Sequence, residues 1–128
     1  MSGKRILVVD DDSLLAKTID VCLTRRGHDV KVFHSGANAV KSLFEEQPDL
    51  MVVDIRLPDC DGWFLAEMLK KLDLSQKVRM IVMSVLDPDR VKVADTKPYA
   101  YIQKPFDMGQ LMQAVEESLD TGELMIGA

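Results

Sequence analysis

Four apolar runs of this chain each end in a side chain that could take part in metal or phosphoryl chemistry. Asp10, Asp11 and Asp12 follow residues 6–9, Asp54 follows 50–53, Ser84 follows 78–83, and Lys104 follows 99–103. Carboxylates that lie close together repel one another unless a cation neutralises them. Oxygen ligands suit Mg²⁺, which takes one or two protein carboxylates together with a phosphoryl oxygen.

The same residue types are those that phosphoryl transfer needs. A carboxylate can act as a nucleophile and form an aspartyl-phosphate. Transfer of the phosphoryl group depends mainly on positioning and on neutralising its three equatorial oxygens. A metal ion, the ammonium of Lys104 and the hydroxyl of Ser84 could supply both. Acids at strand ends are also common as helix N-caps, which is the role we expect for Asp12 or Ser13.

The positions of these residues depend on an alternation of strands and helices. The pattern predicts strands at 6–9, 30–33, 50–53, 78–83 and 99–103, and helices at 13–26, 37–46, 62–71, 89–95 and from N-cap Asp107 to about residue 119. Strands that are almost wholly apolar need cover on both faces, which predicts a parallel sheet in a doubly wound α/β/α sandwich. In such sheets the working crevice lies at the carboxyl ends of the strands. The polar side chains should therefore converge there.

Length and composition predict a single domain without nucleic-acid or membrane contacts. The 128 residues fit one domain at 1–120, followed by a tail or the start of a linker at 121–128. The net charge of −5 argues against a nucleic-acid surface, and no apolar run is long enough for a membrane span or a signal peptide. Two cysteines without a Cys/His cluster predict neither a disulfide framework nor a zinc site. We expect a reducing, cytoplasmic compartment.

Four segments together resemble a known family. ILVVDDD near the start, VVDIRLPDCDG in the middle, IVMS at the fourth strand and YIQKPF before the last helix are similar to the receiver domain of two-component response regulators. The resemblance covers about residues 4–120. It implies a flavodoxin-like fold with five parallel strands in the order 2-1-3-4-5.

The resemblance implies a role for each carboxylate. Asp54 corresponds to the residue that accepts the phosphoryl group. Asp11 corresponds to a direct Mg²⁺ ligand, Asp10 to one that acts largely through water, and Asp54 and the backbone carbonyl of Arg56 complete the protein ligands. Mn²⁺ is the alternative ion.

Other residues correspond to the phosphoryl-binding and switching positions. Ser84 matches the hydroxyl residue and Lys104 the lysine that bind the phosphoryl group, and Lys104–Pro105 matches a cis peptide. Ser84 and Tyr101 are the implied switch residues. Phosphorylation would draw Ser84 inward and let Tyr101 move, which would change the face formed by the fourth helix, the fifth strand and the last helix.

The family also implies partners. A histidine kinase or a phosphotransfer protein would donate the phosphoryl group, and the domain would catalyse the transfer to and the hydrolysis from its own Asp54 rather than act as a conventional enzyme. A downstream effector protein or domain would read the changed face, which could also form a homodimer.

The chain departs from the family pattern near Ser84. Val85 replaces the usual Ala or Gly, and its branched side chain should narrow access to Asp54 and slow small donors or water. The segment between Ser84 and Lys104 is slightly shorter than usual, and Lys97-Pro98 precedes the fifth strand, which predicts a short or irregular fourth helix.

Two residues at the mouth of the crevice match positions where receivers tune the lifetime of the phosphoryl group. Arg56 lies two positions beyond the phospho-accepting residue, and Leu86 lies two beyond the hydroxyl residue. Arg56 could reach Asp87, although a solvated arginine is expected because exposed ion pairs contribute little.

Two alternatives stay open on the sequence alone. The first is a pseudo-receiver that binds a partner without phosphate, which the substitution at Val85 and the shortened segment favour. The second is a phosphatase of the haloacid dehalogenase type with Asp10 as nucleophile. The second fits poorly, because Leu14 stands where that family has Thr or Val and no second acidic pair follows the lysine.

Overall fold

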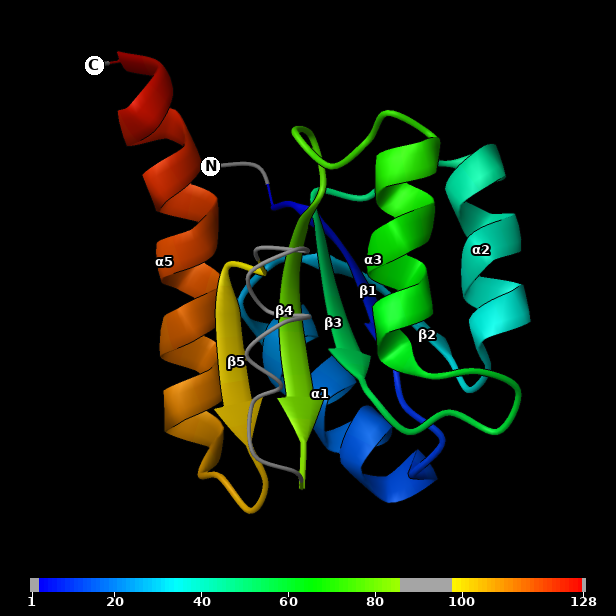
Figure 1. Cartoon of the computed structure of the whole chain (residues 1–128). Helices are drawn as coiled ribbons and strands as arrows, with labels where there is room; N and C mark the ends of the chain where they lie inside the picture. The colour runs from blue at the N-terminus through cyan, green and yellow to red at the C-terminus, as the bar shows by residue number, and fades with distance from the viewer. Residues whose placement is uncertain (1–2, 86–97, 128) are drawn as a thin grey trace.

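Five parallel strands form one sheet at the centre of the molecule (Figure 1). The computed structural model describes residues 3–85 and 98–127. The strands are β1 (Arg5–Val9), β2 (Asp29–Phe33), β3 (Leu50–Asp54), β4 (Arg79–Ser84) and β5 (Ala100–Gln103). Their order is β2-β1-β3-β4-β5, with every neighbouring pair parallel. The predicted fold class and strand order are confirmed.

The described helices cover both faces of the sheet. They are α1 (Ser13–Arg25), α2 (Gly36–Glu45), α3 (Gly62–Lys71) and α5 (Met108–Gly127). α1 and α5 lie on one face and α2 and α3 on the other (Figure 1). The helix predicted at 89–95 lies outside the described residues. Among these residues, no helix combines the length and the apolar character needed to cross a bilayer.

Aspartate side chains cap three of the four described helices and fix where they begin. The carboxylate of Asp12 accepts hydrogen bonds from the backbone N–H groups of Leu14 and Leu15, each 3.1 Å long, so Asp12 is the N-cap of α1. Asp61 caps α3, and Asp107 caps α5 by accepting from the N–H of Gln110 at 2.8 Å. Each cap satisfies a backbone donor that the first helical turn leaves without an intrahelical partner.

The observed bounds of the described elements differ from the predicted ones by at most one residue, except at the end of α5. β3 and β4 each include the polar residue at their end, because backbone pairing continues through Asp54 opposite Met83 and through Ser84 opposite Gln103. α5 continues to Gly127, through a stretch in which the sequence shows no apolar period. The domain limit at residue 120 stays a prediction.

Two apolar cores lie on either side of the sheet and hold it in place. Alternate strand residues face opposite sides, so that Val8, Val52 and Ile102 pack against α1 and α5, while Val9 and Val82 pack against α2 and α3. Each fully buried Val, Leu, Ile or Met side chain contributes about 1.5–3 kcal/mol to stability. The strand ends are therefore held firmly enough to position side chains.

The same alternation determines which strand-end groups meet. Asp10, Asp54 and Lys104 each lie two residues beyond a side chain that faces α1 and α5, so they share that side of the sheet. Ser84 lies two residues beyond Val82, which faces α2 and α3. The side chain of Ser84 therefore starts from the face of the sheet that α2 and α3 cover.

Candidate functional site

Asp10 is the most deeply buried acid of the crevice. Its side chain is fully buried directly after β1, and its Oδ1 accepts a 2.9 Å hydrogen bond from the N–H of Asp12. Burial raises the pKa of Asp10, and the negative charge of Asp54 adds to this rise. The Asp12 N–H and the nearby Lys104 oppose the rise without cancelling it.

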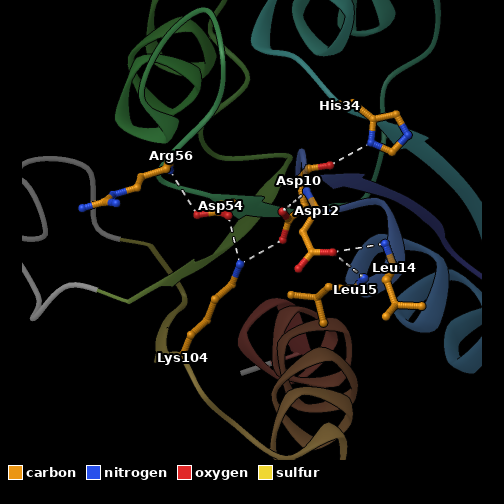
Figure 2. Close-up of polar contacts among 8 residues, drawn as sticks. All are labelled: Asp10, Asp12, Leu14, Leu15, His34, Asp54, Arg56 and Lys104. Carbon is orange, nitrogen blue, oxygen red and sulfur yellow. Dashed lines mark hydrogen bonds and ion pairs between the residues drawn. The ribbon is translucent and has the colours of Figure 1, made fainter.

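Asp54 is held at both of its carboxylate oxygens (Figure 2). Its Oδ1 accepts a 3.0 Å bond from the N–H of Arg56, and its Oδ2 accepts a 2.9 Å bond from Nζ of Lys104. Gly62 packs against the main chain of Asp54, since a Cβ at Gly62 would lie 2.6 Å from the Asp54 carbonyl oxygen. The end of β3 is thus fixed in its backbone and its side chain.

Lys104 joins the two acids. Its ammonium lies 2.9 Å from Asp54 Oδ2 and 3.1 Å from Asp10 Oδ2, and its side chain is mostly buried. Burial alone would lower the pKa of Lys104, but the hydrogen bond to Asp54 and the charges of Asp10 and Asp54 outweigh it and raise the pKa. The ammonium is therefore a fixed positive charge. The peptide between Lys104 and Pro105 is cis.

Three carboxylates in the crevice fit a divalent cation. Asp10, Asp11 and Asp54 each offer an oxygen, and these three atoms lie within 4.8 Å of one another. One ammonium cannot neutralise three carboxylates, so the group favours binding of a further cation. Asp11 is exposed, which leaves room for bound water. Hard oxygen donors and access for water suit Mg²⁺.

Comparison with known proteins identifies the family. A sequence model of the response regulator receiver domain matches residues 6–116. The chain belongs to this family. This receiver domain is 32% identical over 123 residues to the DNA-binding transcriptional regulator NtrC of Azospirillum brasilense, a match that covers 94% of this chain and 25% of NtrC. It is 30% identical to the transcriptional regulatory protein GlrR of Escherichia coli, over 90% of this chain and 26% of GlrR. The chain therefore spans about a quarter of the length of these relatives.

Solved structures share the fold of the receiver domain. A CheY-like receiver domain protein from Methanospirillum hungatei superposes with a TM-score of 0.88 at 28% identity, covering 97% of this chain and 99% of that one. The response regulator TrrA of Thermotoga maritima, in complex with Mg²⁺-BeF, superposes with a TM-score of 0.78 at 25% identity, covering 90% and 98%.

The receiver domain brings most of the predicted site residues to one edge of the sheet. Asp10, Asp11, Asp54 and Lys104 gather there, whereas Asp12 serves as the cap of α1. Ser84 is buried at the end of β4, and its carbonyl accepts a 2.7 Å bond from the N–H of Lys104.

The remaining predicted residues lie around this group. Val85 is 54% exposed next to Ser84, and Arg56 is exposed beside Asp54. Tyr101 is half-buried and its ring stacks on Trp63. Leu86 and Asp87 lie outside the described residues.

Two residues that contact the site loops were not found from the sequence. His34 Nδ1 lies 2.9 Å from the backbone carbonyl oxygen of Asp10. Asp59 accepts 2.8 Å bonds from the N–H groups of Gly36 and Ala37 at the start of α2. His34 directly follows β2, so its place at this edge of the sheet has a sequence signal, whereas its contact with Asp10 has none.

Proposed function

We propose that this receiver domain is a phospho-accepting signalling switch. In the transfer, an Asp54 carboxylate oxygen attacks the phosphorus of a phosphohistidine on a histidine kinase or phosphotransfer protein. A P–O bond forms as the P–N bond breaks, and the departing imidazole keeps the electron pair. The observation that carries this proposal is the ammonium of Lys104, 2.9 Å from Asp54 and 3.1 Å from Asp10.

Each side chain has a definite task in this reaction. Asp10, Asp11, Asp54 and the carbonyl of Arg56 would hold Mg²⁺, which when bound neutralises charge on the phosphoryl oxygens. Lys104 supplies a positive charge that is already in place, so little reorganisation accompanies the transfer. The N–H of Arg56 and Nζ of Lys104 each donate to one carboxylate oxygen of Asp54, which keeps this carboxylate in one orientation.

Loss of the phosphoryl group would return the domain to its starting state. Water attacks the phosphorus, the P–O bond to Asp54 breaks, and the carboxylate is regenerated with release of inorganic phosphate. Val85 is exposed beside Ser84, which supports a role for its branched side chain in limiting access of water and small donors. Arg56, exposed at the same mouth, and Leu86 are proposed to tune this lifetime as well.

The proposed output depends on Ser84 and Tyr101. A phosphoryl group on Asp54 would offer the hydroxyl of Ser84 a charged acceptor, and Tyr101 on the adjacent strand would respond. We propose that the face formed by β5, α5 and the segment between β4 and β5 then binds an effector protein or domain, or a second copy of the chain. Neither nucleic acid nor membrane is proposed as a direct partner.

The proposal is tested by phosphorylation of the purified chain. Acetyl phosphate with Mg²⁺, and separately a cognate histidine kinase, should add one phosphoryl group to the wild type in intact-mass spectra. Asp54→Asn should remain unmodified, and EDTA should stop the reaction.

Two results would contradict the proposal in different ways. A wild type that neither donor modifies would favour a pseudo-receiver. Modification that survives Asp54→Asn but is lost in Asp10→Asn would favour the phosphatase-like alternative. Asp54→Asn keeps the shape of the side chain, so circular dichroism should show an unchanged fold.

A further inference from the structure

We propose that His34 is a positioning residue for the cation site. Its ring N–H holds the peptide group between Asp10 and Asp11, and thereby sets where the Asp11 carboxylate lies. The inference rests on the proposed function, since it assigns Asp11 to Mg²⁺. His34 lies outside the four sequence segments that resemble the receiver family.

The contact itself determines the state of the His34 ring. Nδ1 lies 2.9 Å from the backbone carbonyl oxygen of Asp10 (Figure 2). A carbonyl oxygen can only accept a hydrogen bond, so Nδ1 must carry the hydrogen. Neutral His34 is therefore the Nδ1–H tautomer, with Nε2 as the free acceptor nitrogen of the ring.

Within the described part of the chain, His34 binds the backbone carbonyl of Asp10, while other groups bind the N–H and both carboxylate oxygens of Asp10. The N–H of Asp10 donates to the carbonyl of Phe33 at 3.1 Å, Oδ1 accepts from Asp12, and Oδ2 accepts from Lys104. The carbonyl oxygen belongs to the peptide plane that leads into Asp11. Because Asp11 is exposed, the orientation of this plane largely decides where its carboxylate lies. Outer contacts of this kind orient metal ligands and raise affinity.

The turn that carries His34 is also bound to the loop after β3, which is the second loop that would supply ligands to Mg²⁺. Gly36 and Ala37 donate their N–H groups to the carboxylate of Asp59 at 2.8 Å each. Asp59 belongs to the loop after β3, which also provides the carbonyl of Arg56. The residues from His34 to Ala37 therefore connect the loop of Asp10 and Asp11 to the loop that follows Asp54.

Close packing keeps this turn in register. A Cβ at Gly36 would lie 2.2 Å from Sγ of Cys60, so the turn fits directly against the loop after β3. Ser35 caps α2 by accepting from the N–H of Asn38 at 3.3 Å. His34 is thus the last residue before a fixed helix start, which limits the positions that its ring can take.

Three substitutions of His34 distinguish the effect of its N–H donor from the effect of its ring. In Asn the amide nitrogen occupies the place of Nδ1, so His34→Asn keeps the donor. His34→Gln places the amide one bond further, at the place of Nε2, and His34→Ala removes the donor. His34 is exposed, so all three variants should fold.

The test is a Mg²⁺ titration of the purified chain, followed through the amide NMR signals of Asp11 and Asp12. His34→Ala and His34→Gln should weaken Mg²⁺ binding by about 10-fold, the lower end of the effect of outer contacts on metal affinity. His34→Asn should stay within about 2-fold of the wild type, because it retains the donor. Long-range ¹H–¹⁵N spectra of the metal-free wild type should show His34 as the Nδ1–H tautomer.

The results that overturn the inference differ from those that overturn the proposed function. If the wild type does not bind Mg²⁺, both the proposed function and the inference fail. If the wild type binds Mg²⁺ and His34→Ala binds it with equal affinity, only the inference fails. Equal losses in His34→Asn and His34→Ala would overturn it too, since the ring would then act through packing.

Discussion

The ring of Tyr101 stacks on the indole of Trp63, with centroids 6.2 Å apart and planes 24° from parallel. Trp63 is buried at the start of α3, directly after Gly62, which packs on the main chain of Asp54. Stacked aromatic pairs contribute about 0.5–1.5 kcal/mol beyond the burial of their area. The proposed switch residue Tyr101 is therefore in contact with the element that packs against the proposed phosphorylation site.

The indole of Trp63 should report binding at the site. Mg²⁺, and then beryllofluoride with Mg²⁺, should each change the tryptophan fluorescence of the wild type. Trp63 is the only tryptophan, it stacks on Tyr101, and it follows Gly62, which packs on the main chain of Asp54. In Asp54→Asn the beryllofluoride response should be lost. If the fluorescence of the wild type stays constant under both additions, Trp63 is not coupled to the site at Asp54.

Gly62→Ala should destabilise the domain. The new Cβ would meet the carbonyl oxygen of Asp54 at 2.6 Å and Cα of Ile55 at 3.0 Å, and backbone atoms cannot rotate away as a side chain can. We expect a loss of about 1–3 kcal/mol in the free energy of unfolding, measured in urea. Gly109→Ala is the matched control, because its Cβ would meet only the Asp107 side chain, at 3.1 Å. Equal stabilities of the two variants would show that Gly62 is not tightly packed.

Asp11→Asn should have opposite effects on stability with and without Mg²⁺. Without the ion it removes one of three neighbouring negative charges, so the free energy of unfolding should rise by up to about 1 kcal/mol. With Mg²⁺ at 100 times its Kd, the wild type should gain about 2.7 kcal/mol and the variant should gain much less. Thermal unfolding with Mg²⁺ and with EDTA measures both. The exposed Asp120→Asn serves as control and should respond to Mg²⁺ as the wild type does.

Asp59→Asn should show a pH-dependent loss of stability. The N–H groups of Gly36 and then Ala37 lower the pKa of the Asp59 carboxyl. A carboxyl whose pKa is lowered in the folded state stabilises the fold above its unfolded pKa, and this contribution is lost as the pH falls through the folded value. The wild type should therefore be more stable than Asp59→Asn by a constant margin above about pH 4, and the margin should shrink below it. Urea midpoints between pH 7 and the onset of acid unfolding test this, and a margin that grows in acid would contradict it.

The sequence was sufficient to predict that Asp10, Asp54 and Lys104 meet. Each follows an apolar run of clear strand length, and a parallel sheet brings the carboxyl ends of its strands to one edge. Their equal offset from Val8, Val52 and Ile102 also places them on one side of the sheet. The length of the apolar runs and the two-residue period of a strand, which can both be read from the sequence, determine these positions.

The contacts of His34 and Asp59 could not be predicted in the same way. His34 lies 24 residues from Asp10 in the sequence, and Asp59 lies 22–23 residues from its two partners at the start of α2. No periodic pattern determines how loops so far apart in sequence approach one another. Asp59 is one of several acids in its loop, and nothing in the sequence indicates that it reaches α2. The last turns of α5 were not predicted either, because residues 121–127 have no apolar period.

The most direct test of the account is to locate the phosphoryl group within the chain. After treatment with the kinase and Mg²⁺, borohydride reduction converts a phosphorylated aspartate to homoserine, and peptide mass spectrometry identifies the residue. We predict homoserine at position 54 and at no other aspartate. Homoserine at position 10 or 11, with Asp54 unchanged, would contradict the assignment of Asp54 as the phosphoryl acceptor.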